Sequence, residues 1–168
     1  ALATNPEQTE QLLKVAKVPT HLSEPEANIS ALVQLLWYSV FATNDAADKL
    51  DGQPYDNERT WYWGSDNDRK LNRKVERFDA DPATVTEIAT YYQTSGNLDA
   101  PIVMLHTLQD PTVPYWHEPL YRWKVWQNEA QALHTNIPIL RYGHCNFTAD
   151  EVLFAFVLLI SQVNGEVP

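Results

Sequence analysis

An aspartate and a histidine in the second half of the chain each follow a short apolar run. Asp110 comes after PIVMLH at 101–106, in the segment HTLQDPTVP, and His144 directly follows IPILRYG at 137–143. If both runs are parallel strands, their carboxyl ends lie at the edge of the sheet where ligands usually bind. A carboxylate that holds one imidazole nitrogen leaves the other free to take a proton from a hydroxyl. We therefore predict that Asp110 and His144 are the acid and base of a catalytic triad, although each alone also fits an ordinary turn residue.

The sequence contains no serine in the setting that such a pair requires. A nucleophilic serine of this type stands in a G-x-S-x-G turn between a strand and a helix, but no two of the five glycines are four positions apart. None of the six serines lies at a predicted strand-to-helix turn: Ser23, Ser30, Ser39, Ser65, Ser95 and Ser161. We therefore expect the nucleophile to come from polypeptide upstream of these residues or from a second chain, and this chain alone to be inactive.

Cys145, the single cysteine, is a weaker candidate for the nucleophile. A thiolate beside a histidine is suitable chemistry. Side chains of consecutive residues seldom face each other, however, and the pairing of His144 with Asp110 would then be unused. We expect Cys145 to be a small buried thiol.

No metal site or cofactor is predicted. Several residues near the predicted strand ends could suggest one, namely His106, Asp110, His117 and His144. Their spacing matches no zinc pattern. His106 is instead expected to pack or to support the loop that carries Asp110.

The second half of the chain, residues 95–168, reads as two strands that alternate with two helices. The expected order is strand 101–106, loop 107–115, helix 116–133, strand 137–143 and helix 149–163. Pro138 should stand near the start of its strand, where a missing amide donor is tolerated. Thr148 and Glu151 match the capping box S/T-x-x-E ahead of the last helix. This order predicts a parallel α/β unit with open edges.

The first half, residues 1–94, reads as almost wholly helical. Helices are expected at 6–17 and 28–50, then after a cap at Ser65 or Asp66, and from Asp81-Pro82, with a loop at 51–65. The third helix is expected to carry Leu71, Val75 and Phe78. The second helix should bury a wide face formed by Ile29, Leu32, Val33, Leu36, Trp37, Val40 and Phe41.

Aromatic residues outside these helical stripes could line a substrate pocket. The candidates are Trp61, Trp63 and Tyr115, because ester substrates with apolar groups need apolar walls. The same residues could equally well pack one part of the protein against another. For Trp37, which lies on the apolar stripe, burial is favoured.

Composition narrows the classes of partner. The chain has 168 residues and a net charge of −10, and its few basic residues form no extended stripe, so nucleic acid is not an expected partner. Its longest apolar stretches, 31–42 and 152–160, are shorter than the roughly 20 residues that span a bilayer. The first residues do not resemble a signal peptide.

In combination, PIVMLHTLQDPTVPYWHE and LRYGHCNFTADEV resemble the α/β-hydrolases, in which the acid and the histidine follow the last two strands of the sheet. The upstream segments, FATNDAADKLDGQPYDN and those after it, resemble the helical lid of bacterial, mostly exported members. The resemblance implies the C-terminal half of a serine esterase: a lid at 1–94, core elements at 95–168, an ester substrate, and a periplasmic or secreted location.

Two further implications follow from resemblance. His144-Cys145 is similar to half of a pattern in tannases and feruloyl esterases, where a cysteine beside the histidine bonds to one beside the serine. That similarity implies a disulfide between Cys145 and a missing half. The alternative to an enzyme is a degenerate hydrolase half, or a helical interaction module, that docks a partner chain along an open strand edge.

Overall fold

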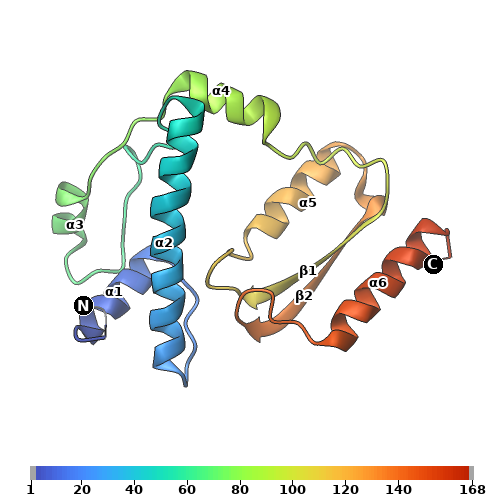
Figure 1. Ribbon diagram of the computed structural model, residues 1–168, viewed down its shortest axis with the longest axis horizontal. Coiled ribbons are helices and arrows are strands. Elements are labelled where there is room, and N and C mark those ends of the chain that lie inside the picture. Colours follow the sequence, from blue (N-terminus) through green and yellow to red (C-terminus); the bar gives the residue numbers. More distant parts are fainter. Residues whose placement is uncertain (1–2, 167–168) are drawn as a thin grey trace. The chain divides into compact units, whose positions relative to one another are not determined.

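The computed structural model describes residues 3–166 and divides into two compact units, Ala1–Gln93 and Thr94–Pro168. Figure 1 shows that the first unit contains helices and that the second contains both strands. Together they make a mixed α/β protein with a two-stranded parallel sheet, as predicted at this coarse level. Each unit is described by itself.

Four helices build the first unit: α1 (Pro6–Ala16), α2 (Pro25–Leu50), α3 (Asp68–Lys74) and α4 (Pro82–Tyr91). Proline stands in the first turn of α1, α2 and α4, where a missing amide donor breaks no helical hydrogen bond. The Asp81 side chain caps α4 by accepting hydrogen bonds from the backbone of Ala83 and Thr84. The predicted start of this helix is therefore confirmed.

The buried face predicted for α2 is wrong in its extent. The hydrophobic core of the unit comprises Leu13, Val18 and Leu32. Several residues of the predicted face are 41 to 62% exposed, namely Val33, Leu36, Trp37, Val40 and Phe41. At 1.5 Å per residue, α2 is about 39 Å long and α1 about 17 Å, so α1 can cover only part of it.

The limits predicted for α3 are also wrong. Asn67, rather than Ser65 or Asp66, caps the helix by accepting a backbone hydrogen bond. The helix ends before Phe78, whose backbone N–H donates to the side chain of Asn57 at 2.7 Å. The Phe78 N–H therefore donates to a loop residue, Asn57, and is not available for the helical hydrogen bond that it would make if α3 continued.

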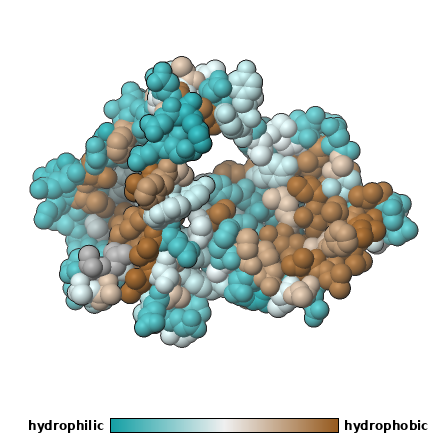
Figure 2. All heavy atoms as spheres, in the orientation of Figure 1, coloured by the Kyte–Doolittle hydropathy of each residue, from teal (hydrophilic) through white to brown (hydrophobic). Residues whose placement is uncertain are grey.

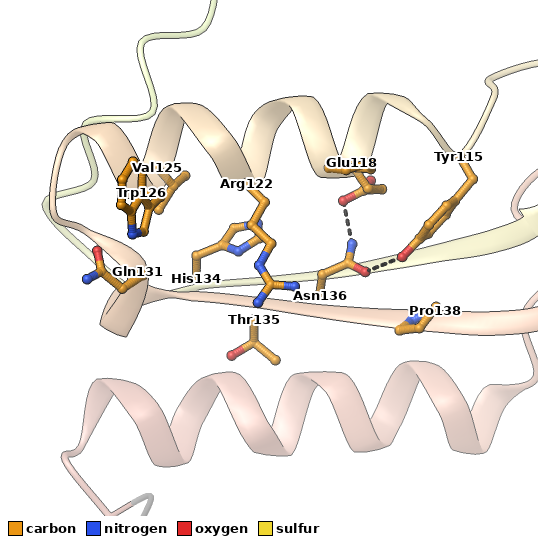
Figure 3. Close-up of a pocket in the computed structure, with 11 residues that line it drawn as sticks. Tyr115, Glu118, Arg122, Val125, Trp126, Gln131, His134, Thr135, Asn136 and Pro138 are labelled. Carbon is orange, nitrogen blue, oxygen red and sulfur yellow. Dashed lines mark hydrogen bonds between the residues drawn. The ribbon is translucent and has the colours of Figure 1, made fainter.

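In the second unit, β1 (Ile102–Gln109) and β2 (His134–Tyr142) lie side by side and parallel. Between them the chain forms α5 (His117–Gln127) and a short 3-10 turn, η1 (Gln131–Leu133), and α6 (Ala149–Val163) follows β2. Helix α5 lies on one face of the sheet and α6 on the other (Figures 1 and 3). This arrangement confirms the predicted order of strands and helices.

Three boundaries in this unit differ from prediction. Strand β1 extends to Gln109, and α5 ends at Gln127 rather than at 133. Strand β2 starts at His134, so Pro138 lies in the middle of the strand, opposite His106. Proline is tolerated there because β2 pairs only with β1 within residues 3–166, and an edge strand has one side without ladder bonds.

Helix α6 confirms the predicted capping box at Thr148 and Glu151. Its apolar side chains are largely uncovered, and seven are 44 to 63% exposed: Val152, Leu153, Phe154, Phe156, Val157, Ile160 and Val163. Figure 2 shows the resulting hydrophobic area in brown over α6. None of the helices described combines the length and apolar character needed to cross a membrane.

Candidate active site

The end of β1 places a buried carboxylate in a fixed orientation. Asp110 is 2% exposed. Its Oδ1 accepts hydrogen bonds from the backbone N–H groups of Thr112 at 2.8 Å and Val113 at 2.9 Å. These two bonds form because the chain turns sharply after the strand, at Pro111. They hold the carboxylate in place and leave Oδ2 for a second partner.

That second partner is His144, which follows β2. Its Nδ1 lies 2.8 Å from Oδ2 of Asp110. The prediction that the two groups meet at the carboxyl ends of parallel strands is therefore confirmed. An ionised carboxylate can only accept, so Nδ1 carries the proton and Nε2 presents a lone pair. The His144 side chain is 48% exposed, so Nε2 is accessible.

Two hydrogen bonds attach the loop that carries His144 to the end of β1. The Thr107 hydroxyl donates to the carbonyl of Gly143 at 2.5 Å, and the Gly143 N–H donates to the carbonyl of Gln109 at 3.2 Å. Sequence reasoning missed Thr107, which is 1% exposed. The available signal was a polar, β-branched residue at the end of an otherwise apolar run.

The other side of the loop is attached to α6. Arg141 donates to the backbone carbonyl of Asn146 at 2.7 Å and makes two bonds to the Glu151 carboxylate, at 2.7 and 3.0 Å. The Arg141 side chain and the backbone N–H of Thr148 lower the pKa of Glu151 from its ordinary 4.5 to about 2. Glu151 therefore serves both the helix cap and the loop.

This arrangement predicts a pH-dependent stability difference between the parent chain and Glu151→Gln. Because the folded pKa is depressed, the contribution of Glu151 is complete above the unfolded value of 4.5 and is lost as pH falls towards about 2. The variant should unfold at lower temperature than the parent at neutral pH, and the gap should close on acidification. Thermal unfolding followed by circular dichroism across this range measures the gap.

Asp150→Asn is the matched control, since Asp150 also lies in the first turn of α6. It tests the general effect of a carboxylate at a helix N-terminus without the Arg141 pair. A gap for Glu151→Gln that stays constant between neutral pH and pH 2, or one that Asp150→Asn reproduces, contradicts the assignment.

Cys145 differs from both expectations for it. Its thiol is exposed rather than buried. Its Sγ lies 3.6 Å from Nε2 of His144, so these consecutive side chains do face each other. The reason is local, because Cys145 has a φ of 49°, in the left-handed region. Within residues 3–166, no hydroxyl is hydrogen-bonded to Nε2.

Comparison of the chain with protein-family models, curated proteins and solved structures gave no match. Burial, and then the negative charge of Asp110, raise the pKa of the Tyr142 hydroxyl.

The three aromatic candidates belong to two different units. Trp61 and Trp63 belong to the first unit, in the loop before α3, and are 61% and 58% exposed. Tyr115 belongs to the second unit, where its hydroxyl donates to Asn136 at 3.0 Å. Its ring also packs edge-on against His106, with centroids 5.5 Å apart, which confirms a packing role for that histidine.

No group of His, Cys, Asp and Glu side chains with the geometry of a metal site occurs in the part of the chain that is described.

Proposed function

We propose that Asp110 and His144 are the acid and base of a serine hydrolase that acts on carboxylic esters. The observation that supports this proposal best is the 2.8 Å contact between Nδ1 of His144 and the buried carboxylate of Asp110. Asp110 fixes the tautomer and stabilises the imidazolium that forms during reaction. The proposed α/β-hydrolase core comprises residues 95–168, with residues 1–94 as its lid.

In the proposed reaction, a serine from polypeptide outside these residues attacks the ester carbonyl. Nε2 of His144 takes the serine proton, and the same proton passes to the oxygen of the departing alcohol. Water, deprotonated by Nε2, then cleaves the acyl-enzyme, and the carboxylic acid leaves. Throughout, Oδ1 of Asp110 keeps both backbone donors. Trp61, Trp63 and Tyr115 are proposed to contact the apolar part of the ester.

A serine-directed fluorophosphonate probe tests the proposal. It should label the complete protein with its upstream polypeptide or partner chain, should fail to label the isolated 168 residues, and should fail to label the complete protein carrying His144→Ala. Because Sγ of Cys145 lies 3.6 Å from Nε2, the control variant is Cys145→Ala, which should keep its labelling. A labelled isolated chain, or a complete protein that His144→Ala leaves fully reactive, refutes the assignment.

A non-catalytic docking module is the second candidate, favoured by the uncovered apolar side chains of α6 and by the open edges of the two-stranded sheet. In that case α6 or a strand edge contacts a partner, and the pair at 110 and 144 is only structural. The fluorophosphonate probe separates the two, because a docking module without a serine nucleophile leaves the complete protein unlabelled.

A further inference from the structure

A cavity lies between α5 and β2, and neither Asp110 nor His144 is among the residues that line it. It has a volume of about 620 Å³, and Tyr115, Glu118, Arg122, Trp126, His134 and Asn136 line it. Figure 3 shows these side chains converging from the helix and from the start of the strand. Asn136 precedes Tyr142, the last residue of β2, by six positions, which corresponds to about 20 Å along the strand.

Two hydrogen bonds link three side chains along one wall of this cavity. The Tyr115 hydroxyl donates to Oδ1 of Asn136, and the Asn136 amide donates to the Glu118 carboxylate (Figure 3). Glu118 is only 7% exposed. Its charge is therefore directed at Asn136.

Arg122 lacks the partner that its position would suggest. It lies one helical turn after Glu118, the spacing at which an ion pair commonly forms on a helix. No ion pair or hydrogen bond involves its guanidinium within residues 3–166, because Glu118 is turned towards Asn136. In Figure 3 the Arg122 side chain reaches down the cavity towards β2.

His134 forms part of the same wall, and its ring packs edge-on against Tyr121 with the centroids 5.6 Å apart. Its Nε2 is buried and has no hydrogen-bond partner among the described residues. Burial lowers the pKa of His134, Glu118 opposes this change, and Arg122 adds to it. The lowered pKa favours the neutral imidazole. Nε2 itself has almost no accessible surface, so a ligand in the cavity does not reach it.

We propose that this cavity binds a small aromatic carboxylate. Its carboxylate oxygens accept hydrogen bonds from the Arg122 guanidinium, and its ring lies against Trp126. A guanidinium and a carboxylate form charge-assisted, often paired hydrogen bonds, which makes this anion a better fit than a neutral ligand. The proposed contacts use none of Asp110, His144 and Tyr115, so the proposal does not rest on the hydrolase assignment.

Titration of the 168-residue chain with benzoate tests the proposal, with benzyl alcohol as the neutral ligand of similar shape. Chemical shifts of the Trp126 indole and the Arg122 guanidinium should report binding of benzoate, with a dissociation constant in the millimolar range typical of so small a ligand. Benzyl alcohol should bind at least about tenfold more weakly, since it lacks the charge-assisted bonds.

Arg122→Gln should weaken benzoate binding about tenfold, and Arg122→Lys, which keeps the charge but not the planar fork, should weaken it less. Arg69→Gln is the matched control: it makes the same change on α3 and should have no effect. Equal binding of the two ligands, or benzoate binding that Arg122→Gln leaves unchanged while its unfolding temperature matches the parent, overturns the proposal.

Discussion

Asp110→Asn should lower kcat of the complete protein for an ester substrate by about 10⁴-fold. The asparagine oxygen can still accept from Thr112 and Val113, as Oδ1 of Asp110 does. Its amide then occupies the position of Oδ2, 2.8 Å from Nδ1 of His144. An amide donor there requires Nδ1 to accept, so the proton moves to Nε2, which can no longer take the serine proton.

The change of tautomer can be measured without the nucleophile. Nitrogen-15 spectra of the 168-residue chain should show the Nδ1–H form of His144 in the parent and the Nε2–H form in Asp110→Asn. Asp99→Asn, the same substitution at an exposed aspartate, should change neither the tautomer nor kcat. An unchanged kcat in Asp110→Asn would falsify the proposed role of the carboxylate.

Gly96→Ala should strongly destabilise the second unit. Gly96 has a φ of 76°, and a Cβ there would lie 2.5 Å from the backbone carbon of Lys124 and 2.6 Å from the nitrogen of Val125. These atoms belong to the backbone of α5 and cannot rotate away. Overpacking of about 2 kcal/mol and left-handed strain of about 1 kcal/mol add to about 3 kcal/mol. For a unit of this size, that loss corresponds to a fall of about 12 to 24 °C in the unfolding temperature.

Gly165→Ala separates the two contributions. Gly165 has a similar φ of 70°, but a Cβ there meets nothing within 4 Å. This control should therefore show only the conformational cost, about 1 kcal/mol. Differential scanning calorimetry of both variants measures the difference. Equal unfolding temperatures for the two would mean that the close approach of Gly96 to α5 is unimportant.

Local signals in the sequence predicted the starts of two helices, α4 and α6, correctly. The cap at Asp81 and the capping box at Thr148 depend on groups within one helical turn, so neighbouring residues suffice to identify them. The same locality explains the failure at Phe78. Its N–H is taken by Asn57, 21 positions earlier in the chain, which no local pattern reveals.

The meeting of Asp110 and His144 was predictable although the residues are 34 positions apart. Two apolar, β-branched runs joined by a helix indicate parallel strands, and parallel strands bring their carboxyl ends to one edge. The exposure of Trp37 was not predictable, because helical spacing shows which face of α2 is apolar but not whether another element covers it.

The amino-acid sequence by itself determined the parallel α/β order of the second unit, the caps of its last helix, and the pairing of one carboxylate with one imidazole. These features depend on residue type and on short-range or strand-order rules. Only the tertiary structure decided where Cys145 points and that Arg122 lines a cavity with no ion pair or hydrogen bond to its guanidinium among residues 3–166. Those outcomes depend on single backbone angles and on competition between distant side chains, and sequence patterns carry no information about either.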